Sequence, residues 1–329
     1  MRERSRSRRV GAAALLAAAL TASLAAGCTR GHAPADDGRG RQTAPGMGGG
    51  TGRSVGDTGP VLAVKIDNVG AARPQRGLDA ADVVYAEQVE GGLSRLMAVY
   101  ASRLPEAVGP VRSARESDLE LLGQFDRPVL AFSGAQHKLL PLIDKASLRP
   151  ETPEGTSGAY YRGTDRPAPH NLYLHPDRLL PSAPGPAALT TGFHYGAAPA
   201  GGRAEATRTV RYPAARFTFT WSPGRHRYLV AMDGTPAVTA DGEPVAPATV
   251  VVQHVTVRDS AYHDVLGNNT PFTETVGAGK AEVLRDGRAF DATWTRPTVH
   301  DGTDFTGPDG APVNFANGQV WVVFTESDG

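Results

Sequence analysis

The sequence predicts a mixed α/β fold, with an N-terminal α/β sheet domain followed by a smaller β-rich C-terminal domain. In the first half, apolar runs of strand length alternate with segments of helical periodicity, as in an α/β layer. Beyond Arg208, short apolar runs are separated by Asp-Gly turns, which is typical of antiparallel strands. A Pro/Ala/Gly-rich stretch at 181–202 separates the two patterns. We therefore assign 60–202 to the first domain and 203–329 to the second.

Three strands are expected at the start of the first domain, at 61–67, 82–90 and 93–101. Gly91-Gly92 joins the second strand to the third and predicts a two-residue hairpin turn. That turn would pair Glu90 with Leu93 and Gln88 with Arg95. Because opposite and diagonal residues share a face of a sheet, Glu90, Gln88 and Arg95 should lie together.

A helix is expected to begin within V-G-P-V-R-S-A-R-E-S-D, residues 108–118. Ser113 and Glu116 have the spacing of a capping box. Arg115 falls on the apolar stripe of this helix and should point toward the protein body. A strand at 128–132 and a second helix at 136–146 follow.

The N-terminus has the features of a secretory signal peptide at residues 1–27. Five arginines precede an apolar run that is shorter than a membrane-spanning helix. Cys28 is the single cysteine and follows Leu-Ala-Ala-Gly, which resembles a bacterial lipobox and predicts lipidation of its thiol. The alternative is an ordinary signal peptide with a chance cysteine. Residues 28–59 have few large apolar side chains and are expected to form a disordered tether.

The composition excludes several classes of protein. Without residues 1–27 the chain carries a formal net charge of −4, which together with export argues against a nucleic-acid partner. The nine histidines lack HxxxH or HExxH spacing, so no metal site is expected. The Gly-rich segment at 276–281 lacks the spacing of a phosphate-binding loop, so no cofactor is expected.

Polar residues from separate segments are candidates for one binding site. Guanidinium groups beside a helix N-terminus are suited to a carboxylate, phosphate or sulfate. Arg73 lies in a loop after the first strand, where open α/β sheets often bind ligands, and two prolines stiffen the segment that presents His170 and Asn171. The candidate site comprises Arg73, Glu90, Arg95, Arg112, Arg115, His170 and Asn171. The alternative is an internal charge network in which Glu87 or Glu90 satisfies the arginines.

The ordered motifs resemble the YerB-like bacterial lipoprotein family. The matching segments are V-K-I-D-N, A-R-P-Q-x-G-L, A-D-V-V-Y-A-E-x-V-E-G-G-L-S-R, G-P-V-R-S-A-R and A-P-H-N, followed by a β-rich half ending in G-Q-V-W-V. The resemblance covers nearly everything from Pro60 onward. It implies an α/β domain plus a β-rich domain anchored outside the membrane, but no reaction, substrate or cofactor.

The leading hypothesis is a lipid-anchored protein on the extracytoplasmic face of the cell membrane. It would act in binding or assembly and take an anionic small molecule or cell-wall fragment at the arginines. The alternative is an envelope hydrolase or transferase with His170 as general base. A third possibility is a structural scaffold that uses the same residues as a buried network.

Overall fold

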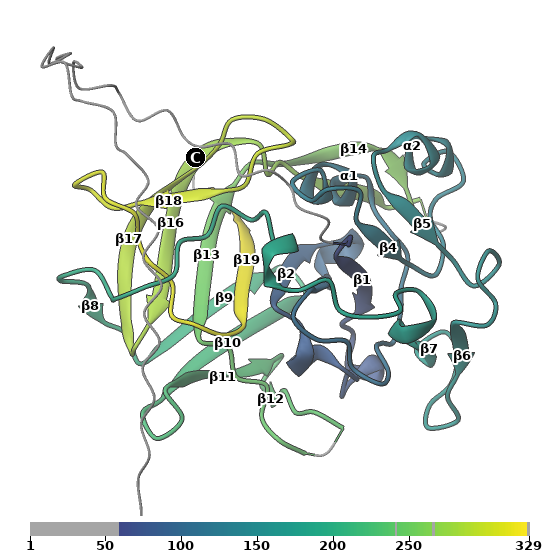
Figure 1. Cartoon of the computed structure of the whole chain (residues 1–329), viewed down its shortest axis with the longest axis horizontal. Coiled ribbons are helices and arrows are strands. Elements are labelled where there is room, and N and C mark those ends of the chain that lie inside the picture. Colours follow the sequence, from purple (N-terminus) through teal and green to yellow (C-terminus); the bar gives the residue numbers. More distant parts are fainter. Residues whose placement is uncertain (1–58, 241, 265–266, 328–329) are drawn as a thin grey trace, which may run out of the picture. The chain divides into compact units, whose positions relative to one another are not determined.

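The fold is mostly β, and the α/β class predicted from the sequence is wrong. The computed structural model describes residues 59–240, 242–264 and 267–327 (Figure 1). These residues form nineteen strands but only two short α-helices, α1 (Glu116–Leu122) and α2 (Leu140–Lys145). The predicted signal peptide, Cys28 and nearly all of the tether lie outside the described residues. Within them, neither helix has the length and apolarity needed to cross a membrane.

One eleven-stranded sheet organises the molecule. In order across the sheet its strands are β18 (Asp304–Thr306), β17 (Arg288–Arg296), β16 (Gly277–Arg285), β13 (Thr249–Val255), β19 (Val320–Glu326), β2 (Val83–Gln88), β3 (Ser94–Tyr100), β1 (Leu62–Asp67), β4 (Val129–Ala131) and β5 (Arg149–Glu151), with β8 (Arg203–Ala204) beside β17. β19 runs parallel to both β13 and β2, and β4 runs parallel to β1 and β5. The remaining pairings are antiparallel.

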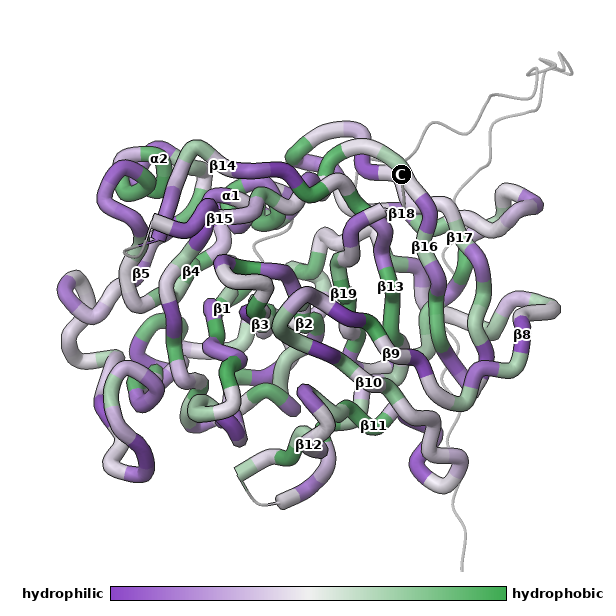
Figure 2. The backbone as a smooth tube through the Cα atoms, turned by 180° about the vertical axis from the view of Figure 1, so that it is seen from behind, coloured by the Kyte–Doolittle hydropathy of each residue, from purple (hydrophilic) through white to green (hydrophobic). Residues whose placement is uncertain are grey.

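Smaller elements cover this sheet. A four-stranded sheet contains β12 (Thr235–Pro236), β11 (Arg227–Met232), β10 (Ala215–Ser222) and β9 (Thr207–Tyr212), and two hairpins pair β14 (Val257–His263) with β15 (Asn269–Thr273) and β6 (Tyr160–Arg162) with β7 (Leu172–Leu174). The 3₁₀ turns are η1 (Gly70–Ala72), η2 (Leu78–Ala80), η3 (Glu90–Gly92), η4 (Pro176–Arg178) and η5 (Pro186–Ala188). Figure 2 shows hydrophobic residues along the central strands β13 and β19 and hydrophilic residues along β14.

The two faces of the main sheet carry separate hydrophobic cores. Alternate residues such as Val64 and Trp321 pack with Phe217 and Phe219 of the four-stranded sheet. The other face packs against α1, α2 and the loops around Phe193 and Phe315. Because every residue of β1 is buried, its apolar run looks like a strand of a parallel α/β sheet. The second layer on one face is a sheet rather than helices, which explains the wrong fold class.

The strands predicted from apolar runs are confirmed, whereas the second helix is shorter than predicted. α2 spans Leu140–Lys145 instead of 136–146, and Pro141 lies in its first turn. The main sheet draws strands from both sides of residue 202, and β19 lies between β13 and β2 (Figure 1). The division into 60–202 and 203–329 stays a prediction, and limited proteolysis between Pro181 and Gly202 would test it.

Candidate functional site

The candidate site lies where β1, β2 and β3 meet the N-terminus of α1. In the strand register, Arg95 of β3 is opposite Asp67 of β1 on one side and Glu87 of β2 on the other. Residues directly opposite one another share a face of a sheet. The end of the sheet therefore presents one arginine between two carboxylates, beneath the start of α1.

The hairpin register predicted from Gly91-Gly92 is wrong by one residue. Arg95 pairs with Glu87, not with Gln88, and Gln88 pairs with Ser94. The turn is longer than two residues because η3 includes Glu90, and both glycines adopt positive φ, 68° and 69°. Since a one-residue slip exchanges the two faces of a strand, Glu87 joins the charged face in place of Gln88.

The predicted Ser113–Glu116 capping box is also wrong. α1 begins at Glu116, and its N-cap residue is Arg115. The reciprocal bond comes from Asp118, whose Oδ2 accepts from the backbone N–H of Arg115 at 2.7 Å. A carboxylate in the first turn also suits the positive end of the helix dipole. This cap fixes the backbone from which the Arg115 side chain projects.

A buried charge cluster lies under the start of α1. Lys65 is fully buried and forms salt bridges with Glu87 and with Asp118, the latter at 2.6 Å. Ser117 donates a hydrogen bond to the other oxygen of Glu87 at 2.9 Å. Burial lowers the pKa of Lys65 to about 8, although Asp118 favours the charged form. These contacts fasten α1 to β1 and β2.

Arg115 points into the protein, as predicted, and is neutralised there. Its Nε and NH2 atoms donate to the two oxygens of Glu90 at 2.6 and 2.7 Å. Thr270 of the β14–β15 hairpin donates to the same carboxylate at 2.6 Å. Burial opposes ionisation of Glu90, but the hydrogen bonds from Arg115 outweigh it and lower the pKa of the carboxyl group. This pair agrees with the internal-network alternative for Arg115.

Arg112 has a different environment. Its Nε atom lies 3.1 Å from Oδ2 of Asp67, and the same oxygen lies 2.8 Å from Nδ1 of His170. One oxygen of Asp67 is therefore shared between the guanidinium of Arg112 and the imidazole of His170. The Nε atom of Arg112 is buried yet makes no hydrogen bond within the described part of the chain. The Arg112 side chain is 27% exposed, against 12% for Arg115.

Two predicted site residues lie elsewhere. Arg73 binds Asp233 at 2.8 Å and the carbonyl of Met232 at 3.0 Å, which ties the loop after β1 to the four-stranded sheet. Asn171 accepts from Arg162 at 2.8 Å and donates to the Gly163 carbonyl, so it braces the β6–β7 hairpin. Neither lines the pocket beside Arg112.

Four of the remaining residues surround a pocket of about 410 Å³, whereas His170 contacts Asp67 without lining that pocket. Arg95, Arg112, Arg115 and Glu90 line it together with Ser113 and Glu116, while Val89, Leu93, Leu139 and Tyr262 form an apolar part of the wall. Arg95 donates to the Ser113 carbonyl at 3.0 Å. Burial and the neighbouring Arg115 lower the pKa of Arg95 to about 9, so it stays charged at neutral pH. We call this cavity the arginine pocket.

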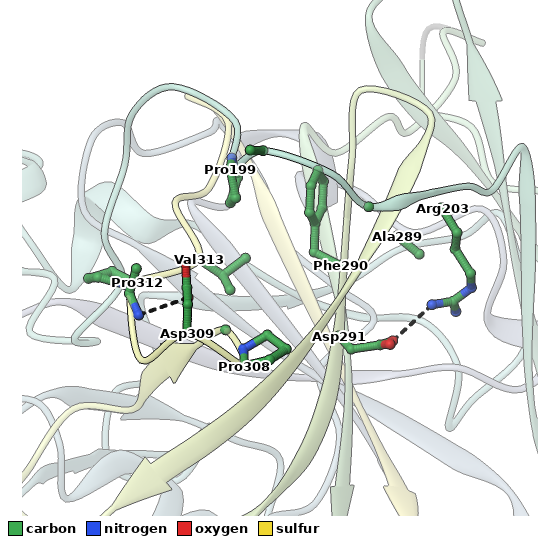
Figure 3. A pocket seen from close by; sticks show the side chains of 13 residues that line it. Pro199, Arg203, Ala289, Phe290, Asp291, Pro308, Asp309, Pro312 and Val313 are labelled. Carbon is green, nitrogen blue, oxygen red and sulfur yellow. Dashed lines mark hydrogen bonds and ion pairs between the residues drawn. The ribbon is translucent and has the colours of Figure 1, made fainter.

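A second hollow, of about 550 Å³, lies beside β17 and offers different chemistry (Figure 3). Its wall is largely Pro199, Phe290, Pro308, Pro312 and Val313. Its arginine, Arg203, is already paired with Asp291 at 2.9 Å and with Glu282. Carboxylates therefore neutralise the guanidinium of Arg203 more fully than that of Arg112.

Sequence reasoning named Glu90 and, in the alternative network, Glu87, but it missed Lys65 and Asp67. Lys65 and Asp67 stand two apart within the apolar run of the first strand, so they share a face, and Glu87 follows Tyr85 in the same way. A lysine inside a buried strand was the available signal of a charged cluster. Nothing in the sequence around Thr270 indicated that it would donate to Glu90. Among the described residues, no group of three or more acidic, histidine or cysteine side chains is arranged to hold a metal ion.

Both halves of the chain match domains of a known family. Residues 49–187 match the N-terminal domain, and residues 208–322 the C-terminal domain, of a protein of unknown function (DUF3048). The chain is 25% identical over 280 residues to "Putative lipoprotein YerB" of Bacillus subtilis (strain 168), covering 79% of this chain and 80% of that protein. The crystal structure of YerB from Bacillus subtilis superposes with a TM-score of 0.67 at 21% identity, covering 82% of this chain and 91% of the other. The chain belongs to the YerB-like family, as its motifs predicted.

Proposed function

We propose that this chain is a lipid-anchored protein of the cell envelope that binds an anionic ligand in the arginine pocket. Its relative from Bacillus subtilis is named a lipoprotein, and Cys28 follows a lipobox-like sequence. These two facts support an anchor at Cys28 on the extracytoplasmic face. Intact-mass measurement of the membrane-extracted protein should find a diacylglyceryl group at Cys28. An unmodified chain with a different start would contradict the anchor.

The observation that supports binding is the environment of Arg112. Arg112 shares its carboxylate partner with His170, lines a pocket open to solvent, and has a buried Nε without a hydrogen bond. An anionic ligand in the pocket would meet the exposed part of the Arg112 side chain, whose Nε atom contacts Asp67. Arg115, whose guanidinium is already bound by Glu90, would shape the wall and leave the ligand to Arg112 and Arg95.

The test is calorimetric titration with anions of different geometry. We expect inorganic phosphate, sulfate or an anionic cell-wall fragment to bind the wild-type protein, and Arg112→Ala to weaken that binding at least tenfold. Arg73→Ala is the matched control, because Arg73 lies outside the pocket and should leave the affinity unchanged. Failure of all these anions and of simple carboxylates to bind would contradict the proposed function.

A second candidate function is an envelope hydrolase or transferase with His170 as general base. One observation favours it: the 2.8 Å contact between Nδ1 of His170 and the buried carboxylate of Asp67. Such a carboxylate holds an imidazole in one orientation. A turnover assay with anionic wall fragments would test it. Activity that disappears in both His170→Ala and Asp67→Asn would favour catalysis over binding.

A further inference from the structure

We infer that the ligand of the arginine pocket is a small organic monocarboxylate with an apolar substituent, rather than a phosphate or another dianion. This inference rests on the proposed anion-binding function and specifies its chemistry. Three features of the pocket lead to it: the balance of charge around the arginines, the shape of the available donor, and the apolar part of the wall.

The charges around the arginines are already balanced. The cations are Lys65, Arg95, Arg112 and Arg115, and the carboxylates are Asp67, Glu87, Glu90 and Asp118. Glu116 also lines the pocket and adds negative charge. A ligand with one negative charge therefore disturbs this balance less than a dianion would in a partly enclosed site.

The shape of the donor favours a carboxylate. A guanidinium group offers parallel N–H donors that match the two oxygens of a carboxylate. Arg115 makes this fork with Glu90 inside the protein. Arg112 contacts its protein carboxylate through Nε, the inner nitrogen of the guanidinium. The same planar geometry is thus available at Arg112 for a carboxylate that comes from outside.

The apolar wall gives the ligand its second feature. Leu93 is 39% exposed, and it is one of three large hydrophobic residues so exposed in the described part of the chain. It lies beside Val89, Leu139 and Tyr262 in the same pocket as the arginines. A carboxylate bound at Arg112 would place a neighbouring apolar group against Leu93, and burial of such surface favours binding. A volume of about 410 Å³ is in the range of small-molecule sites.

The test compares N-acetyl-leucine with its uncharged amide and with inorganic phosphate, by calorimetric titration of the full chain. We expect N-acetyl-leucine to bind at least tenfold more tightly than either. Phosphate binding that depends on Arg112, without binding of N-acetyl-leucine, would overturn this inference while supporting the proposed function. Absence of binding by every anion would overturn both.

Two variants test the carboxylate and the apolar substituent of the ligand separately. Arg112→Lys keeps the positive charge but loses the planar fork, so it should weaken N-acetyl-leucine about tenfold and leave the amide unchanged. Leu93→Ser should weaken N-acetyl-leucine severalfold without altering the affinity for acetate. Arg103→Lys is the control, since Arg103 is exposed and pairs with Asp79 outside the pocket. Equal affinities of all three variants for N-acetyl-leucine would overturn the inference.

A longer ligand identifies the source of the carboxylate. The peptide acetyl-Ala-Ala-Leu presents the same end group as N-acetyl-leucine at the end of a chain. Tenfold tighter binding of the peptide would support recognition of a peptide C-terminus, and equal binding would support a free acid. Weaker binding of both than of their amides would overturn the carboxylate assignment.

Discussion

Arg296 and Arg112 lie near opposite ends of α1 and differ in how fully the protein satisfies them. Arg296 is completely buried, and its nitrogens donate to Asp301 O, Glu120 O, Val299 O and Thr275 Oγ1 at 2.7 to 2.9 Å. Arg112 is 27% exposed and has a buried nitrogen without a hydrogen bond in the described chain. The fold satisfies the Arg296 side chain fully, whereas part of the Arg112 side chain stays accessible to solvent.

The partners explain the difference. Carbonyls at the C-terminal end of a helix carry partial negative charge, so a cation there is favourable without a carboxylate. Burial nevertheless lowers the pKa of Arg296, against the influence of Tyr85 and Glu120. At the other end of α1 the dipole disfavours a cation, so Arg115 requires Glu90. Arg112 lies near the N-terminal end of α1, where the dipole disfavours a cation, and it shares its carboxylate partner with His170. It is therefore suited to bind an external anion.

The largest stability effect is expected for Arg296→Ala. The substitution leaves several buried acceptors unsatisfied and opens a large cavity, so it should cost about 4 kcal/mol or more. In a chain of this size the melting temperature should fall by about 10 °C. Arg288→Ala is the control, because Arg288 is exposed and also bonds two carbonyls of the Gly201-Gly202 segment. Equal losses for the two variants would show that burial of Arg296 has no special role.

A slightly smaller loss is expected for Arg115→Ala. It leaves the buried Glu90 carboxylate without its cation, which costs about 3 kcal/mol. Chemical denaturation would measure the free energy of unfolding. Arg258→Ala provides the comparison, because its salt bridge with Glu274 is 50% and 37% exposed and should contribute less than about 1 kcal/mol. If Arg115→Ala were no worse than Arg258→Ala, Glu90 would not depend on Arg115.

The same pair should make stability depend on acidity. The folded state lowers the pKa of Glu90 below its ordinary value of 4.5. The unfolded chain therefore binds the proton more readily, so this contribution is present above about pH 4.5 and is lost as the pH falls through the folded pKa. Between pH 7 and 3.5, wild type should lose more unfolding free energy than Glu90→Gln. Parallel pH profiles would contradict a stabilising Glu90 carboxylate.

The smallest stability effect is expected for Arg112→Ala. The Arg112–Asp67 pair is partly exposed, and His170 remains beside Asp67, so the change should be within about 1 kcal/mol. Thermal unfolding without added anion measures it. A loss as large as that of Arg115→Ala would make Arg112 a structural arginine.

Much of this arrangement could be predicted from local patterns, but not the distances that decide its chemistry. The apolar runs identified β1, β2 and β3, and the helical stripe placed Arg115 toward the interior. The hairpin failed because two adjacent glycines do not specify how many residues a turn contains. That single residue decides whether Glu87 or Gln88 faces Arg95.

Long-range packing limited the rest of the prediction. The fold class was wrong because an apolar run reports burial on both faces without identifying the covering layer. Arg73 was included in the site for its position after a strand, but its partner is Asp233, 160 residues away in sequence. Asp67 and His170 are likewise distant in sequence and meet only in the folded chain.

The most direct test of the central claim is the anion-dependent melting temperature of wild type, Arg112→Ala and Arg115→Ala. A ligand that binds only the folded state raises the melting temperature, and the increase grows with the logarithm of ligand concentration above the Kd. We predict that N-acetyl-leucine or another anion stabilises wild type in a concentration-dependent way. Arg112→Ala should melt within a few degrees of wild type without ligand and gain nothing from it, whereas Arg115→Ala should already melt well below wild type. A large loss of stability in Arg112→Ala, with no stabilisation of wild type by any anion, would contradict a binding role for Arg112.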